Sequence, residues 1–252
     1  DAVRVGFDPT ASINLAYTMV GSSARGPRTD DGRIKPDIGA PGASVSAIAG
    51  SGSRIGPFGG TSGAAPMVTG TVALIKEKYG DRLSVPQIKV LLMNSATPDI
   101  WQNFPGGTLA AITRMGAGQV DAAAAYSTTL IAWDSTESDT TTWTGSLSFG
   151  YVAAAVDTAI TRTLTLLNLD SETQEVTLQS FFRFADDANA GVVVAPQATT
   201  VSIPPGATVL VPVQLRIYPA IQAQPRRWVR SIRGRSTAVN PVQTAISSPN
   251  KR

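Results

Sequence analysis

The sequence predicts an α/β segment over residues 1–129, followed by an all-β sandwich over residues 130–218. Apolar residues recur at helical spacing between residues 62 and 95, whereas alternation of apolar and polar residues begins after residue 126. Turn residues separate the alternating stretches, which is typical of sandwiches built from short strands. The remaining segment, 219–252, alternates poorly, and its composition favours a loop or disorder.

Two helices and two strands are expected in the α/β segment. Short apolar runs bounded by turn residues predict a strand at Val3–Phe7 and a buried strand at Val45–Ala49. The first helix should run from Ser62 to Tyr79 and end at Gly80, because glycine is a good C-terminal cap. The second helix should begin at Ser84, which has a glutamine three residues later, the spacing of a capping box.

The clearest alternating stretch of the all-β part is Val209–Ile217, which follows the turn sequence Pro204-Pro205-Gly206. Pro212 lies inside this stretch. Because proline donates no ladder hydrogen bond, Pro212 predicts that the strand lies at the edge of its sheet. The alternation stops before the basic end of the chain.

Charge is distributed unevenly along the 252 residues, although the formal net charge is only +3. No acidic residue follows Asp187, so the bulk of the chain is mildly acidic and its end is basic. The arginines around Trp228 resemble a nucleic-acid patch, but basic runs are commonly solvated tails, and we expect no nucleic-acid partner. No apolar run is long enough to span a bilayer, and the sequence carries no sign of the oligomeric state.

Cysteine and histidine are both absent, which excludes disulfides and thiolate metal sites from this chain. No group of carboxylates has the spacing of a calcium loop, and Asp30 and Asp31 are better explained as part of a turn. The sequence therefore predicts no metal site and no cofactor.

One segment carries recognisable chemistry: Gly60-Thr61-Ser62-Gly63-Ala64-Ala65-Pro66-Met67-Val68-Thr69-Gly70. It places Ser62 at the start of a helix, directly after a glycine-rich turn. Backbone N–H groups at a helix N-terminus lack intrahelical partners and can stabilise a developing oxyanion, which suits a nucleophilic serine. Taken alone, Ser62 is more commonly explained as a helix N-cap, and Gly59 and Gly60 as a turn that needs positive φ.

Several ordered blocks favour the nucleophile. The segment above resembles the nucleophile motif of the subtilase family, Gly-Thr-Ser-Met-Ala-x-Pro-His-Val-Ala-Gly. Residues 23–27, 35–42, 84–96 and 116–121 resemble further family blocks in the same order, including Ser-Ala-Arg-Gly-Pro, Lys-Pro-Asp-Ile-Gly-Ala-Pro-Gly and Gly-Ala-Gly-Gln-Val-Asp. The resemblance to subtilisin-like serine proteases covers about residues 15–126. Two positions depart from it: Gly63 stands for the usual Met, and Met67 for a His that is structural in the family.

The resemblance implies that residues 1–129 are the C-terminal part of a subtilisin-like, parallel-sheet catalytic domain. Ser62 would be the catalytic nucleophile, with Thr61 and Gly60 beside the oxyanion hole as substrate-binding residues. Residues 130–218 resemble the fibronectin type III-like sandwich of large secreted subtilases. Because that sandwich usually continues with further strands, whereas this chain continues with a basic segment, the resemblance implies an incomplete sandwich here. The implied activity is hydrolysis of peptide bonds in protein or peptide substrates through an acyl-enzyme, outside the cell or at its surface. Calcium binding by the full-length protein stays open.

A general base is missing from this chain. A neutral serine needs one, and in this family it is a histidine oriented by an aspartate. We therefore expect the triad Asp and His and the oxyanion Asn to lie before Asp1. A protease-associated domain could also be inserted upstream, between those residues and the Ser62 segment. The chain alone is expected to be inactive. Its lysines are poor substitutes, since Lys35 belongs to a family loop and the helical lysines look solvated. The alternative is a non-catalytic, subtilase-like binding or scaffold module.

Overall fold

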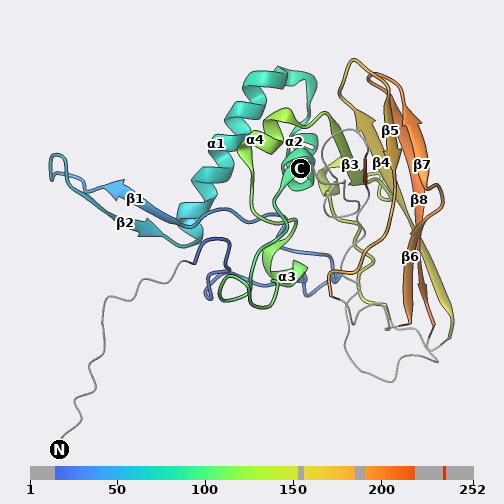
Figure 1. Cartoon of the computed structure of the whole chain (residues 1–252), viewed down its shortest axis with the longest axis horizontal. Helices are drawn as coiled ribbons and strands as arrows, with labels where there is room; N and C mark the ends of the chain where they lie inside the picture. The colour runs from blue at the N-terminus through green and yellow to red at the C-terminus, as the bar shows by residue number, and fades with distance from the viewer. Residues whose placement is uncertain (1–14, 153–155, 185–190, 219–234, 237–252) are drawn as a thin grey trace, which may run out of the picture.

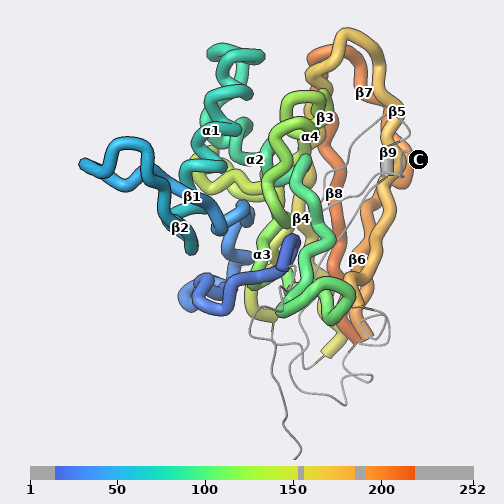
Figure 2. The backbone as a smooth tube through the Cα atoms, turned by 60° about the vertical axis from the view of Figure 1, so that its left-hand side comes forward, coloured from blue at the N-terminus to red at the C-terminus, as the bar shows by residue number. Residues whose placement is uncertain are grey.

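The computed structural model describes residues 15–152, 156–184, 191–218 and 235–236. Helices gather on one side of the molecule and most strands on the other, as Figures 1 and 2 show. The strand predicted at Val3–Phe7 and the basic residues around Trp228 lie outside the described residues.

Both predicted helices are confirmed. Helix α1 (Thr61–Tyr79) ends at Gly80, which has a positive φ of 56° and donates its N–H to the carbonyl of Lys76. Helix α2 (Val85–Ser95) begins with the predicted capping box at Ser84. Three shorter helical elements complete this side: the 3-10 turn η1 (Gly80–Arg82), α3 (Ile112–Met115) and α4 (Ala122–Ser127). A further 3-10 turn, η2 (Thr140–Thr142), lies in the β part.

The predicted strand at Val45–Ala49 exists but is not buried. It forms β1 (Ala43–Ala47), which pairs antiparallel with β2 (Ile55–Gly59) in a hairpin that projects from the body in Figure 1. The Val45 side chain is 64% exposed. The prediction of burial was wrong because β1 pairs only with β2, and no second layer among the described residues covers the hairpin.

The parallel sheet expected for residues 1–129 does not form among the described residues. Parallel pairing there is limited to two isolated bridges, Thr18 with Trp101 and Gly39 with Gln119. A parallel strand needs a neighbour delivered by a crossover connection. The stretch from residue 15 to residue 60 instead consists of irregular backbone and the β1–β2 hairpin. What the structure shows of this part is a mixed α/β arrangement.

The β part consists of two antiparallel sheets with strand orders β3-β4-β8-β6 and β7-β5-β9. A single hydrophobic cluster takes side chains from both sheets, including Leu166 and Val213 of the first and Val176 and Ile203 of the second. The strands are β3 (Leu130–Asp134), β4 (Thr158–Asn168), β5 (Gln174–Thr177), β6 (Val192–Pro196), β7 (Thr200–Ile203), β8 (Thr208–Ile217) and β9 (Arg235–Ser236). Because β9 pairs with β5, the segment 219–252 is not wholly loop or disorder.

Strand β8 is central in its sheet, so the edge position predicted from Pro212 was wrong. It lies between β4 and β6. The carbonyl of Pro212 accepts a hydrogen bond from the N–H of Gln197, just beyond the last β6 residue. The backbone of Pro212 therefore faces the β6 side, at the point where the β6 ladder has ended. The reciprocal bond, from the Pro212 nitrogen to Gln197, cannot form, so the missing N–H affects pairing only at the very end of the β6 ladder.

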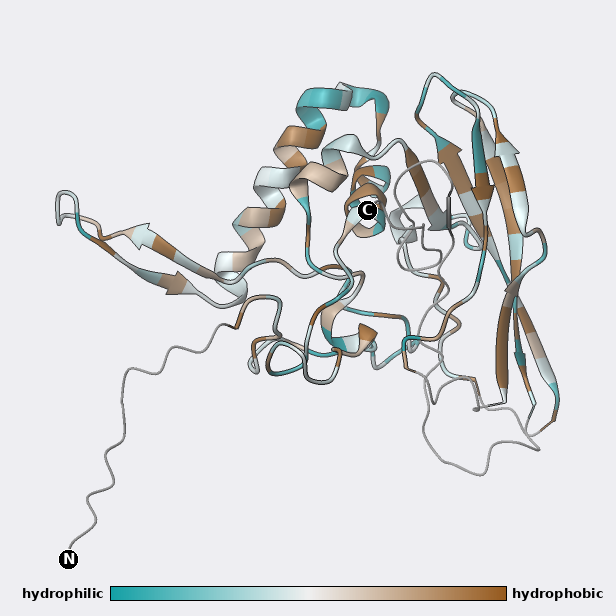
Figure 3. Ribbon diagram, in the orientation of Figure 1, coloured by the Kyte–Doolittle hydropathy of each residue, from teal (hydrophilic) through white to brown (hydrophobic). Residues whose placement is uncertain are grey.

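Strand β3 contributes to two hydrophobic cores. Its residues point alternately to opposite faces, as in any β-strand. Leu130 and Ala132 belong to the cluster between the two sheets, whereas Ile131 and Trp133 belong to the cluster formed with α1, α2 and α4. In addition, the N–H of Ala132 donates to the buried side chain of Asn94 in α2 at 2.7 Å. In Figure 3 the first part of β3 is coloured as hydrophobic, and the colour fades toward the end of the strand.

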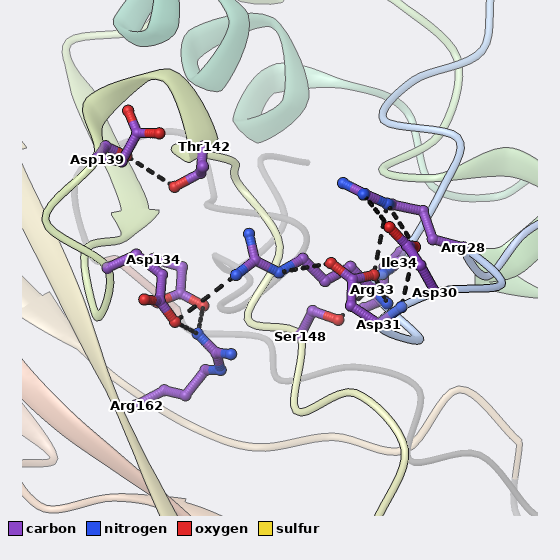
Figure 4. Close-up of polar contacts among 11 residues, drawn as sticks. Arg28, Asp30, Asp31, Arg33, Ile34, Asp134, Asp139, Thr142, Ser148 and Arg162 are labelled. Carbon is purple, nitrogen blue, oxygen red and sulfur yellow. Dashed lines mark hydrogen bonds and ion pairs between the residues drawn. The ribbon is translucent and has the colours of Figure 1, made fainter.

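Polar contacts also join the helical part to the β part. The N–H of Ile34 donates to the hydroxyl of Ser148 at 3.0 Å, and Figure 4 shows these two residues together. Arg33 forms a wider ion pair with Glu137, at 3.6 Å. Arg183 reaches back from the β part and donates through Nε to a carbonyl of the helical part at 2.7 Å. The two parts therefore meet through hydrogen bonds as well as through β3.

Asp30 and Asp31 form a turn, as predicted. Arg28 donates through Nε to the carboxylate of Asp30 at 3.0 Å, and the N–H of Arg33 donates to the carboxylate of Asp31 at 2.9 Å (Figure 4). The hydrogen bond from Arg28, with a second one from the Asp31 N–H, lowers the pKa of Asp30 to about 2. The two carboxylates therefore accept hydrogen bonds from the backbone N–H groups of the turn and from the Arg28 side chain.

Candidate active site

Ser62 is the second residue of α1, and its side chain is exposed. The N-cap is Gly60, whose φ of 72° and ψ of −163° suit glycine, and no side chain caps this end. The explanation of Ser62 as an N-cap was therefore wrong. A capping side chain must precede the helix, whereas Ser62 lies inside the first turn and its hydroxyl is free for other chemistry.

Two backbone N–H groups remain available beside that hydroxyl. The carbonyl of Gly60 already accepts from the N–H of Gly63 at 3.0 Å and of Ala64 at 3.2 Å. The N–H groups of Thr61 and Ser62 lie in the first turn, where no intrahelical acceptor exists. Neither of these two N–H groups donates a hydrogen bond to an acceptor in the described part of the chain. The positive end of the helix dipole adds to their preference for an anion. Thr61, Ser62 and Gly60 are thus brought together at one helix end.

No base for Ser62 is found among the four lysines that the structure describes. Lys35 and Lys89 both pair with Asp37, at 2.5 Å and 3.4 Å. Lys76 lies 14 residues along α1 from Ser62, about 21 Å at 1.5 Å per residue. Lys78, which is half-buried, donates to the carbonyl of Tyr126 in an exposed hydrogen bond. Each of these ammonium groups has a partner elsewhere, and the turn from Gly59 to Met67 carries no ionisable side chain.

Gly63, which replaces the usual methionine of the resembling motif, lies against the backbone of Gly42. A Cβ atom added at Gly63 would be 2.8 Å from the Gly42 carbonyl oxygen, closer than real Cβ contacts come. A Cβ atom added at Gly70, in the same helix, would meet nothing within 4 Å. The two glycines of α1 therefore differ in what a side chain would encounter.

We expect Gly63→Ala to destabilise the protein, although alanine has a helix propensity about 1 kcal/mol better than glycine. Overpacking against a backbone carbonyl costs roughly 1–3 kcal/mol, which exceeds that gain. The matched variant Gly70→Ala should be stabilising by about 0.5–1 kcal/mol because it meets no obstacle. Thermal unfolding of both variants checks this; a raised Tm for Gly63→Ala would contradict the close contact.

Gly42, which stands in the family block at residues 35–42, has a role near Ser62 that its sequence pattern does not predict. The one sequence signal for this role is that position 42 is a glycine although no predicted turn requires one there.

Among the described residues, no three His, Cys, Asp or Glu side chains gather in a way that could hold a metal ion. No helix of the described chain has the length and apolarity needed to cross a membrane.

Comparison with known proteins agrees with the quoted blocks. A model of the subtilase family matches residues 10–140. The minor extracellular protease Vpr of Bacillus subtilis (strain 168) is 38% identical over 98 residues, covering 37% of this chain and 12% of that protein. The subtilisin-like protease SBT3.5 of Arabidopsis thaliana is 42% identical over 89 residues, covering 29% of this chain and 12% of that protein. The chain thus matches about an eighth of the length of these relatives.

Among solved structures, a FixG-related protein from Vibrio parahaemolyticus covers 29% of this chain and 74% of its own, with 19% identity and a TM-score of 0.20. A TM-score this low supports no conclusion about the β part. The family model, in contrast, spans more than half of the chain and includes the Ser62 segment. The chain therefore belongs to the subtilase family.

Proposed function

We propose that this chain carries the nucleophile of a subtilisin-like serine endopeptidase, and that Ser62 forms the acyl-enzyme. One observation carries the proposal: Ser62 is an exposed serine in the first turn of α1, within a family motif, and beside backbone N–H groups without acceptors in the described chain. A capping serine would instead precede the helix and direct its hydroxyl to a first-turn N–H, as Ser84 does at α2.

The reaction would begin when the Ser62 hydroxyl attacks the carbonyl carbon of a peptide bond and gives its proton to a general base. The carbonyl oxygen becomes an oxyanion, which the Ser62 N–H stabilises by a hydrogen bond. Thr61 and Gly60 border this position. The base then protonates the leaving amine, and the C–N bond breaks to give an ester on Ser62. Water, deprotonated by the same base, hydrolyses the ester and restores the hydroxyl.

The base itself has to come from residues outside these 252, because the chain has no histidine and its lysines near the helical part are engaged elsewhere. We propose that the triad His and Asp and an oxyanion Asn are supplied by the preceding part of a longer protein. On this proposal, the chain alone is inactive.

Location and substrates follow from the relatives. One is named as an extracellular protease, and we propose that this protein likewise acts outside the cell or at its surface on proteins or peptides. We further propose that residues 130–218 are a fibronectin type III-like domain, supported by two antiparallel sheets that share one hydrophobic cluster. Calcium binding stays a question for the full-length protein.

A fluorophosphonate probe tests the proposal, because it reacts covalently only with an activated serine. The folded full-length protein should be labelled, and peptide mapping should place the label on Ser62. Prior heat denaturation should abolish the label. The missing histidine gives one reason to consider the alternative, a binding or scaffold module. Absence of label at Ser62 in the folded full-length protein would favour that module and reject the endopeptidase.

A further inference from the structure

Three glycines near Ser62 are not explained by backbone conformation. Gly60 has the positive φ that favours glycine, but Gly42, Gly59 and Gly63 do not. Any residue could adopt their backbone angles. Their lack of a side chain must therefore have another physical reason, such as close approach of a neighbouring backbone.

The reason is that these glycines lie against one another. A Cβ atom at Gly42 would be 2.8 Å from the carbonyl oxygen of Gly60. Cβ atoms at Gly59 and Gly63 would be 2.7 Å and 2.8 Å from the carbonyl oxygen of Gly42. The backbone at Gly42 therefore fits between both sides of the turn that carries Ser62, and it fits only because side chains are missing on each side.

The segment that ends at Gly42 is held firmly at its other end. Gly39 donates its N–H to the carbonyl of Gly118 at 2.7 Å and accepts from the N–H of Val120 at 2.8 Å. The carbonyl of Asp37 accepts from the N–H of Ala117 at 3.0 Å. A Cβ atom at Gly118 would lie 2.1 Å from the carbonyl oxygen of Thr97, directly after α2. These bonds leave the segment from Asp37 to Gly42 little freedom to retreat from the turn.

We propose that Gly42 is a positioning residue for the nucleophile: its backbone, braced by residues 117–120, fixes the Gly60 carbonyl and thereby the first turn of α1. This role rests on the proposed function of Ser62. The Gly60 carbonyl begins the helix by accepting from Gly63 and Ala64. Any shift of that carbonyl moves Ser62 and its N–H together, and a misplacement of about 1 Å costs on the order of 100-fold in rate.

The experiment compares Gly42→Ala with Gly21→Ala in the full-length protein. Gly21 is a matched control because a Cβ atom there would meet nothing within 4 Å and its φ is not positive. For each variant we would measure kcat and KM with a peptide substrate, the rate of fluorophosphonate labelling, and Tm. Hydrogen exchange at the amides of Gly63 and Ala64 reports the turn itself.

Gly42→Ala should lower kcat and the labelling rate by roughly 100-fold at temperatures where the protein stays folded, with KM changed less than about threefold. Exchange at Gly63 and Ala64 should become faster, and Gly21→Ala should match the wild type. Unchanged kcat and labelling in a folded Gly42→Ala variant would overturn the positioning role alone, as would losses that only follow the folded fraction. Turnover retained by Ser62→Ala would instead reject the proposed function, and the positioning role with it.

Discussion

Replacing Ser62 by alanine in the full-length protein is expected to lower kcat by roughly 10⁶-fold, the order found when subtilisin itself loses its nucleophile. Residues 59–67 carry two hydroxyl groups, those of Thr61 and Ser62, and the proposed function assigns the nucleophile to Ser62. Binding should change little, since alanine removes one atom from an exposed position. Steady-state kinetics with a peptide substrate would measure both parameters.

A second serine provides the control. Ser127 is exposed at the end of α4, where its hydroxyl donates only to helix carbonyls. Ser127→Ala should keep the wild-type kcat, and the Tm of Ser62→Ala should stay near that of the wild type. A Ser62→Ala variant that still turns over substrate at more than about a hundredth of the wild-type rate would show that another residue is the nucleophile.

The helices of the site could be predicted because their signals are local. The capping box at Ser84 and the glycine at position 80 act within one turn of the helix they bound, so four or five residues suffice to predict each end. The Ser62 segment was found in the same way, as a run of neighbouring residues. Its exact place in the first turn was not predicted, because a glycine at the N-cap leaves no side-chain signal.

Features set by distant partners could not be predicted from the same patterns. The run at Val45–Ala49 is apolar enough to be buried, yet burial depends on a second layer that the described chain does not supply. Pro212 lies in a central strand, but at the point where the β6 ladder ends, so its missing N–H disturbs little pairing. The close approach of Gly42 to Gly59 and Gly63 likewise joins residues about 20 positions apart. Each of these three features depends on which distant segment packs against the residue in question, and the spacing of apolar residues along the sequence carries no information about that.

A boundary between two domains at residues 129 and 130 remains a prediction, and β3 supplies a direct test of how independent they are. Leu130 and Ile131 are adjacent, both at most 2% exposed, and point into different cores. Truncating a buried Leu or Ile to alanine costs about 2–5 kcal/mol. If the two parts unfold together, Leu130→Ala and Ile131→Ala should each weaken both cores, since each variant loosens the strand that both cores share.

Hydrogen exchange of the full-length protein distinguishes the two cases by reading peptides from α2 (Val85–Ser95) and β8 (Thr208–Ile217) separately. A loss of about 3 kcal/mol corresponds to exchange faster by roughly 100-fold, and we expect it in both peptides for both variants. The control is Leu210→Ala, because Leu210 lies on β8 but is 64% exposed. If Ile131→Ala affected only α2 and Leu130→Ala only β8, the parts would be independent. If both peptides respond to both variants, the β part directly stabilises the helices behind Ser62.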